Sequence, residues 1–228
     1  MRAQSVAAAL RQAVSAGEYS PGEKLNEVIV AEKMGISRNT LREGFASLAA
    51  EGIIDRIPHR GVFITSPTAA DVLSLFRARA VVEPGAVLWS AELDVDALDR
   101  IVSTAEAAET ADVESVDSVD SVESVESVES VDSAAAIALA NQEFHRALVG
   151  ATGSALLDEE MDRLLARMRL VFLAVERVRP NLHGDFVAVN RQIVTMLRDG
   201  DRDAAAAMLR ASLVETGETL AAIVHGTR

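Results

Sequence analysis

Apolar residues recur at helical spacing near the N-terminus, and a short stretch with a different pattern follows. In residues 2–16, Val6, Leu10 and Val14 lie four positions apart, which predicts a helix with one apolar face. Caps, turns and β-prone runs predict two more helices and a hairpin, at 26–35, 38–51, 53–57 and 62–65. Three helices followed by a hairpin predict a winged helix-turn-helix domain over residues 1–66.

After Pro67 the pattern becomes almost wholly helical. The spacing and the capping residues predict six amphipathic helices, over 68–92, 94–111, 134–151, 154–178, 184–199 and 202–224. These segments predict an all-α helical bundle as the second domain, residues 68–228, so the expected fold class is mainly α. Trp89 lies among apolar residues and is expected to be a core aromatic.

Residues 113–133 follow neither the helical nor the strand period. Here the chain repeats Val, an acidic residue and Ser seven times. A three-residue period spreads valine around a helix and over both faces of a strand, so no coherent apolar face forms. Because serine and dense negative charge also disfavour collapse, we expect a disordered acidic loop, and a partner-binding arm is the less favoured alternative.

Composition restricts the class of protein and the chemistry available to it. The chain has no cysteine, which excludes disulfides, thiolate zinc sites and cysteine nucleophiles. No apolar run could span a bilayer and the N-terminus lacks a signal-peptide pattern, so a cytoplasmic protein with no membrane partner is expected. The net charge of −13 argues against a nucleic-acid partner, but residues 1–66 hold eight basic and seven acidic residues. The first domain could therefore lie against DNA.

The third predicted helix carries the chemistry of a DNA-reading helix. Leu41, Phe45 and Leu48 form its apolar stripe, and Arg38 and Arg42 lie four apart on another face. Ser37 is placed to cap the helix, which puts Arg38 and Asn39 in its first turn. Arginine suits guanine and asparagine suits adenine in the major groove. A solvated amphipathic helix would explain the arginine pair alone, and a plain turn histidine would explain His59 alone.

Residues 17–66 resemble the DNA-binding domain of the GntR family. The motifs that carry the resemblance are Gly17-Glu18-Tyr19-Ser20-Pro21-Gly22-Glu23-Lys24-Leu25, Gly35-Ile36-Ser37-Arg38-Asn39-Thr40-Leu41-Arg42-Glu43-Gly44, Leu48-Ala49-Ala50-Glu51-Gly52-Ile53 and Arg60-Gly61. The resemblance implies that Arg38 and Arg42 contact guanines and the DNA backbone, and that the wing tip enters the minor groove. The expected DNA-binding residues are Ser37, Arg38, Asn39, Thr40, Arg42, His59, Arg60 and Gly61.

The second domain resembles the FCD effector-binding domain of the FadR-type branch. Arg79-Ala80-Val81-Val82-Glu83, Phe144-His145 and Gly200-Asp201 carry this looser resemblance, over about residues 69–224. Many members of that branch hold a divalent metal with one Asp and three His, which orients a carboxylate effector. The corresponding positions here are Asn141, His145, Asn190 and Ser212. Since one imidazole with neutral groups is a poor metal site, we expect no metal and no cofactor.

Asn141, His145, Asn190 and Ser212 could instead bind a small molecule through hydrogen bonds alone. A satisfied polar patch or a degenerate pocket explains the same residues equally well. A carboxylate ligand would need a cation, and the candidates in the sequence are Arg146, Arg167, Arg169 and Arg191. Arg79 and Glu83, at i and i+4, are expected to form an intrahelical pair that supports the bundle.

The leading hypothesis is a homodimeric transcription regulator, a repressor, that binds double-stranded, pseudo-palindromic operator DNA. Pairing two half-sites supplies the specificity that one winged helix lacks. A small metabolite, for which a carboxylate is one candidate, is expected to bind in the helical domain without a full metal site and to modulate operator affinity. The alternatives are a regulator with no effector and a metal-dependent carboxylate sensor. An enzyme that uses His145 as a general base is disfavoured, because no nucleophile or paired carboxylates accompany it.

Overall fold

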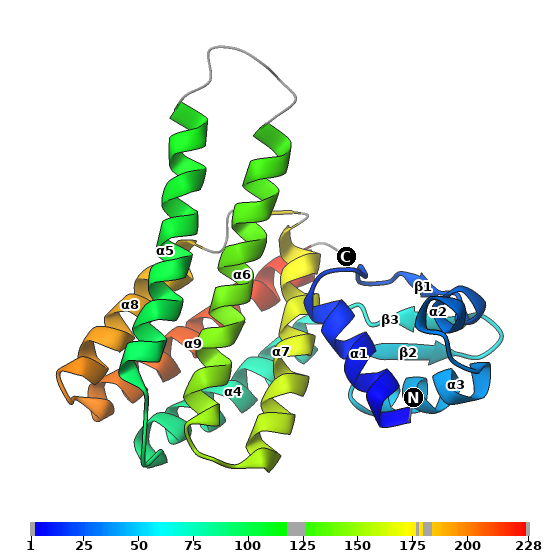
Figure 1. Cartoon of the computed structure of the whole chain (residues 1–228), viewed down its shortest axis with the longest axis horizontal. Helices are drawn as coiled ribbons and strands as arrows, with labels where there is room; N and C mark the ends of the chain where they lie inside the picture. The colour runs from blue at the N-terminus through cyan, green and yellow to red at the C-terminus, as the bar shows by residue number, and fades with distance from the viewer. Residues whose placement is uncertain (1–2, 118–125, 177, 180–183, 227–228) are drawn as a thin grey trace. The chain divides into compact units, whose positions relative to one another are not determined.

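A computed structural model describes residues 3–117, 126–176, 178–179 and 184–226 (Figure 1). In these ranges the order of elements is α1 Ala3–Ser15, β1 Lys24–Leu25, α2 Glu27–Met34, α3 Arg38–Ala50, β2 Ile54–Ile57, β3 Gly61–Ile64, α4 Ala69–Trp89, α5 Val95–Asp117, α6 Glu126–Gly150, α7 Ala155–Glu176, α8 Gly184–Arg198 and α9 Arg202–Gly226. The predicted fold class, a winged helix-turn-helix followed by a helical bundle, is confirmed.

The chain divides into two compact units, each held together by contacts among its own residues. The first unit contains residues 1–75, 162–178 and 217–228, and the second contains 76–161 and 179–216. The winged helix therefore lies wholly in the first unit, together with most of α7.

The helix-turn-helix is delimited by short polar caps and by one left-handed residue. The Asn26 side chain accepts a hydrogen bond from Val28 N at 3.0 Å and begins α2. Gly35 ends α2 with a φ of 63°, a conformation that costs glycine little. Ser37 then begins α3 by accepting a hydrogen bond from Thr40 N at 3.1 Å. The sequence thus fixes both ends of the connection between α2 and α3.

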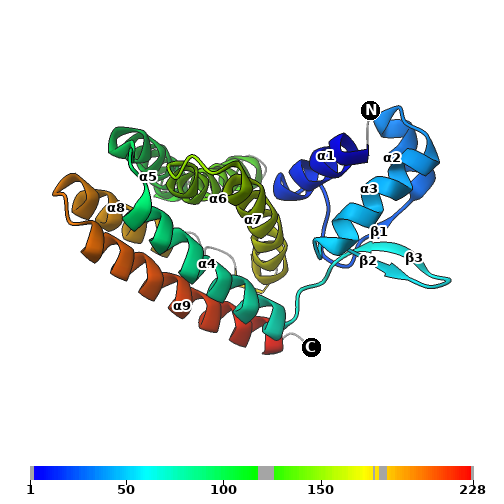
Figure 2. The ribbon, with the colours of Figure 1, turned by 90° about the horizontal axis from the view of Figure 1, so that it is seen from below.

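The wing is a three-stranded antiparallel sheet with the order β1-β3-β2. Ile54 pairs with Ile64 and Ile57 with Gly61, as the predicted hairpin requires. The first strand was not predicted: Lys24 pairs with Phe63 and Leu25 with Val62. Two residues are too few for an alternating pattern, so this strand depends on its tertiary partner. Figure 2 shows α1, α2 and α3 on one side of the sheet.

The core of the first unit joins α1, α3 and the sheet. Val6, Leu10 and Val14 are at most 4% exposed and pack in one cluster with the apolar stripe of α3. Ala166 and Leu170 of α7 belong to the same cluster. Arg11 of α1 also donates two hydrogen bonds of 2.9 Å to the Glu51 carboxylate at the end of α3. These contacts hold α3 firmly from its buried side.

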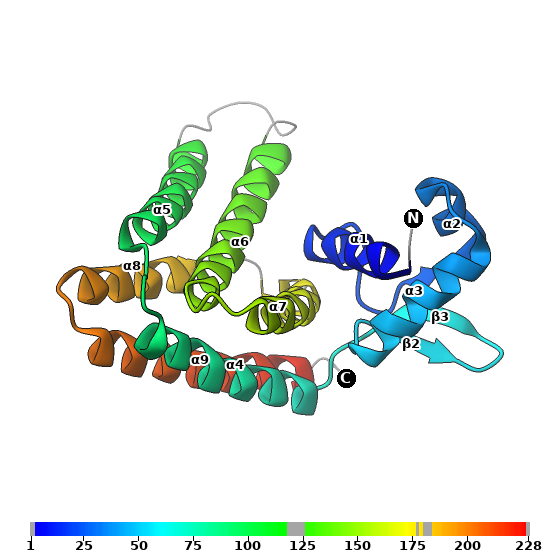
Figure 3. The ribbon, with the colours of Figure 1, turned by 60° about the horizontal axis from the view of Figure 1, so that its bottom comes forward.

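The second unit is built from α5, α6 and α8 with parts of α4, α7 and α9. Figure 1 shows α5 and α6 side by side, and α8 also packs against α5. The chain reverses between α8 and α9 at Gly200, whose φ is 82° (Figure 3). Arg202 at the start of α9 donates a hydrogen bond of 2.6 Å to the Ser90 carbonyl at the end of α4. Every long element described in this unit is helical, as the spacing predicts.

The acidic repeat is more helical than its sequence pattern suggests. Residues 113–117 continue α5 and residues 126–133 begin α6, so the prediction of a loop is wrong at both ends. Residues 118–125 lie outside the described residues. Adding one residue to an existing helix costs far less than nucleating a new one, so the packed parts of α5 and α6 can extend into a repeat that has no apolar face of its own.

The expectation that Trp89 is a core aromatic is also wrong. Its side chain is 87% exposed at the end of α4, although Ala86 and Val87 beside it are buried. Val81 and Leu88 on the same helix are 76% and 44% exposed. Residues next to one another in a helical sequence point to different sides of the helix. Apolar neighbours of Trp89 therefore do not show which side packs against the rest of the protein. In the described part of the chain, no helix is long and apolar enough to span a membrane.

Candidate nucleic-acid interface and polar cluster

The N-terminal turn of α3 exposes the side chains that the sequence assigns to base reading. Arg38 and Asn39 are both exposed, and they follow directly after the capping residue Ser37. Ser37 Oγ also lies 2.8 Å from Thr40 Oγ1, so these two hydroxyls stabilise the helix start. On the opposite side, Leu41 and Phe45 are fully buried. The buried side of the helix therefore fixes its position, and its polar side is exposed to solvent.

Arg42 is held by an acidic residue that the sequence analysis missed. Its Nε donates a hydrogen bond of 2.9 Å to Oε2 of Glu27, the first residue of α2. The side chain of Arg42 remains 52% exposed. The ion pair therefore orients the guanidinium and leaves most of it open to solvent. Glu27 and Arg42 can pair only because α2 and α3 pack against each other. The sequence alone did not reveal that packing.

The wing tip is formed by an unusual backbone and a basic pair. His59 has a φ of 61°, the one positive φ of a non-glycine residue in the described ranges. Gly61 has a φ of 114°, and a Cβ there would lie 3.2 Å from Cε of Lys24. Lys24 Nζ and Arg60 Cζ lie 5.9 Å and 5.8 Å from the centre of the Phe63 ring. Lys24, which the sequence analysis did not assign, therefore adds positive charge beside the wing.

In the second unit, two of the four predicted ligand residues are bonded to each other. Asn190 Nδ2 of α8 donates a hydrogen bond of 2.9 Å to Asn141 Oδ1 of α6, and both residues are buried. The cavity beside them has a volume of only about 10 Å³. A space of this size holds about one water molecule. Ser212 is half-buried on α9, and no hydrogen bond in the described ranges links it to the other three.

His145 belongs to a buried charged cluster with Arg79 and Glu83. Glu83 Oε1 accepts a hydrogen bond of 2.5 Å from Arg79 Nε, which confirms the expected pair within α4. Glu83 Oε2 lies 2.7 Å from Nδ1 of His145 on α6. The sequence did not predict this second contact, because the four-residue spacing accounts only for neighbours on one helix.

Burial and charge act in opposite directions on this cluster. Burial alone would raise the pKa of Glu83, but the charges and hydrogen bonds of Arg79 and His145 outweigh it, so the pKa lies below its usual value. Burial lowers the pKa of His145, and the nearby Glu83 carboxylate only partly offsets that effect. The favoured state is an ionised Glu83 between the Arg79 guanidinium and a neutral imidazole.

These residues do not fit the divalent metal that the resemblance to metal-binding FCD domains implies. One imidazole nitrogen faces Glu83, and the two asparagines are bonded to each other. Among the described residues, no group of three or more His, Cys, Asp or Glu side chains could hold an ion. Amide groups paired with one another offer a poor set of ligands for zinc and related metals.

The structure also distinguishes the arginines that the sequence left as equal candidates. Arg191 is bound by Asp99 and by Glu106, with a distance of 2.6 Å from Arg191 Nη2 to Glu106 Oε2. The hydrogen bonds that Arg191 donates to the Glu106 carboxylate are the largest cause that raises the pKa of Arg191, and burial partly offsets them. Arg169 pairs with Glu176 at 2.8 Å. In the ranges that the structure describes, Arg167 has no ion-pair or hydrogen-bond partner.

Comparisons with known proteins agree with the two kinds of domain found here. Residues 2–64 match the family described as bacterial regulatory proteins, gntR family, and residues 74–215 match the FCD domain. The chain is 34% identical over 90 residues to the HTH-type transcriptional regulator YdhC of Bacillus subtilis, a match that covers 40% of this chain and 38% of the relative. This match thus spans less than half the length of that relative.

Two further comparisons extend over most of the chain. The HTH-type transcriptional repressor GlaR of Escherichia coli is 26% identical over 176 residues, which cover 72% of this chain and 70% of GlaR. A crystal structure of a GntR transcriptional regulator from Rhodococcus sp. RHA1 is 27% identical, covers 96% of both chains and has a TM-score of 0.77. These relatives are regulators and not enzymes. The chain therefore belongs to the GntR family of bacterial regulatory proteins, and its C-terminal part is an FCD domain.

Proposed function

We propose that this protein is a DNA-binding transcription regulator that represses transcription by reading operator DNA with α3. The observation that carries the proposal is the capped, exposed start of α3, where Arg38 and Asn39 stand on a helix whose opposite face is fully buried. The N-terminal residues of a recognition helix meet base edges in the major groove. Repression is supported by the similarity to the repressor GlaR.

Each exposed group of the proposed interface has a distinct part in DNA binding. Arg38 can donate two hydrogen bonds to guanine, and Asn39 can make a paired contact with adenine. Ser37 and Thr40 stabilise the helix start, and Arg42 enters the complex already oriented by Glu27. Lys24 and Arg60 form a basic pair beside the turn that contains His59 and Gly61. This pair can bind phosphate groups or enter the minor groove.

We further propose that the repressor is a homodimer that binds a pseudo-palindromic operator. One winged helix contacts too few base pairs for a specific site, and two copies would bind half-sites about 34–36 Å apart. An exposed apolar strip on α4, formed by Val81, Leu88 and Trp89, supports contact with a second copy. Size-exclusion chromatography with light scattering should find a dimer, and Trp89→Asp with Val81→Asp should shift it toward the monomer. A monomeric wild-type chain at micromolar concentration would contradict the proposal.

The polar cluster of the second unit fits a structural role better than a ligand site. Asn141 and Asn190 are bonded to each other, His145 faces Glu83, and the adjoining space holds about one water. We therefore propose that Asn141, His145 and Asn190 form a polar patch whose partners lie within the protein, and that this patch stabilises the fold instead of binding a ligand. Ser212 has no link to them within the described residues. A small metabolite that modulates operator affinity would need a different cavity.

The proposed reading helix is tested by binding-site selection from random duplex DNA, followed by titration of the selected duplex. Arg38→Ala should weaken binding to the selected site by about 1–3 kcal/mol, which is the usual value of a paired base contact. Arg100→Ala on α5 is the matched control, because it removes an arginine that is also exposed but belongs to the other unit. Equal losses for both variants, or no selected sequence at all, would contradict the proposal.

A further inference from the structure

The side of α3 that faces away from the core carries a row of three exposed residues, namely Asn39, Glu43 and Ala46. The buried side of the same helix is formed by Leu41, Gly44, Phe45 and Leu48. Since successive residues of an α-helix are rotated by about 100°, all three residues of the row point within about 30° of the direction opposite to the buried side. Glu43 therefore lies near the centre of the exposed face of α3.

Arg38 and Arg42 lie on one flank of this row. By the same rotation they point about 110° and about 70° away from the centre of the exposed face, farther than Glu43. A recognition helix turns its exposed face toward the base edges of the major groove. When α3 reads operator DNA as proposed, Glu43 enters the groove beside Asn39, which lies one turn earlier on the helix.

Glu43 differs from Glu27 and Glu51, two carboxylates near α3 that are already bound within the protein. Glu27 accepts a hydrogen bond of 2.9 Å from Arg42, and Glu51 accepts two of 2.9 Å from Arg11. In the ranges that the structure describes, Glu43 has no hydrogen-bond or ion-pair partner. Its carboxylate can therefore accept a hydrogen bond from DNA without breaking one in the protein.

A carboxylate in the major groove selects among the bases through its charge. An ionised carboxylate accepts hydrogen bonds and donates none, and phosphate oxygens repel it. Guanine and thymine present acceptors at the major-groove edge, and adenine presents the acceptor N7 beside its amino group. Cytosine presents its N4 amino group, which donates. Cytosine is thus the base that a carboxylate in this groove fits best.

The charges of the first unit fit a carboxylate that reads bases at the expense of general affinity. Two arginines and two carboxylates border the exposed face of α3, namely Arg38, Arg42, Glu27 and Glu43. The wing strands and the turn between β2 and β3 carry three basic residues and one acidic residue, namely Lys24, Arg56, Arg60 and Asp55. Sequence-independent attraction to phosphate therefore comes mainly from the wing. Around α3 the charges balance, so base contacts have the larger part there.

We propose that Glu43 is a specificity-determining residue that accepts a hydrogen bond from the N4 amino group of cytosine in each operator half-site. This role rests on the proposed function, the reading of operator DNA by α3. Ala46, three residues later on the same face, has a side chain small enough to let α3 approach the bases closely. Opposite guanine or thymine the carboxylate loses water without gaining a donor, so Glu43 also weakens binding to incorrect sequences.

Selection from random duplex DNA, with the full chain and with Glu43→Gln, tests this role. The wild type should select cytosine at one position per half-site where the variant does not. Fluorescence anisotropy then measures affinity at constant salt. The preference for cytosine over adenine at that position should fall by at least about fivefold in the variant, because glutamine pairs with adenine. The variant should also bind an unrelated duplex at least about twofold more tightly, because one negative charge is gone.

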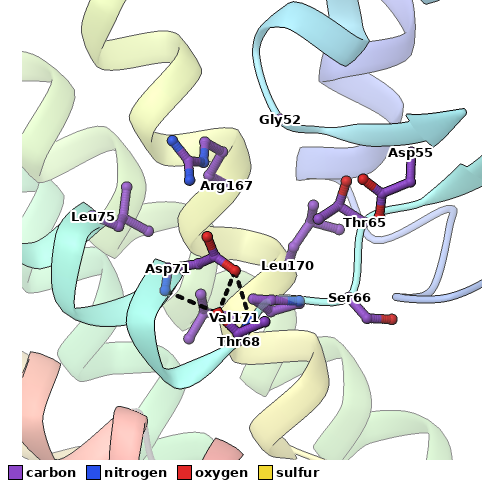
Figure 4. Close-up of a pocket in the computed structure, with 11 residues that line it drawn as sticks. Gly52, Asp55, Thr65, Ser66, Thr68, Asp71, Leu75, Arg167, Leu170 and Val171 are labelled. Carbon is purple, nitrogen blue, oxygen red and sulfur yellow. Dashed lines mark hydrogen bonds between the residues drawn. The ribbon is translucent and has the colours of Figure 1, made fainter.

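Asp55→Asn is the matched control, because it also removes one carboxylate charge from the first unit. Figure 4 shows Asp55 on the wall of a cavity that Gly52 and Arg167 also line, and the residue belongs to β2 and not to α3. This variant should select the same bases as the wild type at every position. A change of base preference as large as that of Glu43→Gln would mean that the loss of any nearby charge alters the preference, and it would overturn the role of Glu43.

The results separate failure of this role from failure of the proposed function. The role of Glu43 is refuted if Glu43→Gln selects the same bases as the wild type, or if the changed position holds a base other than cytosine in the wild-type operator. It is also refuted if the variant binds the unrelated duplex no more tightly than the wild type does. In these cases the wild type still selects a sequence, so the proposed function stands. A wild-type chain that selects no sequence would refute both.

Discussion

The exposed start of α3 and the buried cluster around Glu83 use similar polar groups in opposite ways. Arg38 and Asn39 stand in solvent, and Arg42 is 52% exposed although it pairs with Glu27. Arg79 and Glu83 are no more than 2% exposed, and His145 completes their cluster. Groups in the first region can exchange water for DNA at little cost. The charged groups of the second region already pair with one another.

This difference shows why residue type alone is a poor guide to a binding site. A buried charge that is paired and hydrogen-bonded contributes to a specific fold, and separating it is expensive. An exposed charge contributes little to stability but is available to a partner. Arg167 is intermediate, because it is half-buried and has no ion-pair partner in the described ranges. Its guanidinium is therefore neither bound to a buried carboxylate like that of Arg79 nor exposed like that of Arg38.

The largest expected effect comes from breaking the buried cluster. Glu83→Ala leaves the Arg79 guanidinium buried without its carboxylate, which should lower the free energy of unfolding by about 3–5 kcal/mol. Urea unfolding followed by circular dichroism measures the change. Glu143→Ala on α6 is the control, because that carboxylate is exposed, and it should change stability by less than about 0.5 kcal/mol. Similar values for the two variants would mean that the cluster is no more important than an exposed carboxylate.

A substitution in the exposed region should affect DNA binding and leave folding nearly unchanged. Asn39→Ala removes the proposed adenine contact, which should weaken binding to the selected operator by about 1–3 kcal/mol and relax the base preference at one position per half-site. Fluorescence anisotropy on a set of single-base operator variants measures both effects. A uniform loss on all sequences would instead assign Asn39 to the DNA backbone.

Acid should destabilise the buried cluster before it affects the exposed region. Burial lowers the pKa of His145 below 6.5, and the balance of burial against Arg79 and His145 holds that of Glu83 below 4.5. The unfolded chain therefore binds more protons, so the free energy of unfolding should fall as the pH drops below about 6.5, and again below about 4.5. His145→Gln should remove the upper part of this fall. The same pH dependence in the variant would assign it to other groups.

The smallest effect on stability and on operator affinity is expected from breaking the exposed ion pair between Glu27 and Arg42. Glu27→Gln releases Arg42 from its carboxylate, and exposed pairs contribute about 0–1 kcal/mol to stability. Operator affinity should change by less than about fivefold, because Arg42 keeps its charge and its place on α3. Thermal unfolding and anisotropy measure the two quantities. A loss as large as that of Arg38→Ala would make Glu27 an essential orienting residue for Arg42.

The sequence predicted the winged helix well because its signals are local. Asn26, Gly35 and Ser37 determine helix ends through their own backbone and neighbouring amides. It missed β1, because two residues form a strand only when β3 lies beside them. It also failed at Trp89, because the apolar residues around it do not reveal which side of α4 is covered.

The predicted effector residues illustrate the same limit in the second unit. Asn141 and Asn190 do meet, as the resemblance to FCD domains implied, and Ser212 has no hydrogen bond to them within the described residues. His145 and Glu83 lie 62 positions apart in the sequence, on α6 and α4, so no local pattern predicts their contact. Arg191 pairs with carboxylates of another helix, α5, whereas Arg169 pairs with Glu176 of its own helix, and this difference could be seen only in the structure.

The sequence by itself determined the order of the elements, the caps of α2 and α3, and the family to which the chain belongs, because these depend on neighbouring residues and on motifs read in register. Only the tertiary structure decided which polar groups are already satisfied. A side chain becomes available for a ligand or for DNA when folding leaves it without a partner, and partners come from distant parts of the chain. That is why Arg38 and Arg167 stand apart from Arg79 and Arg191, although all four are arginines on helices.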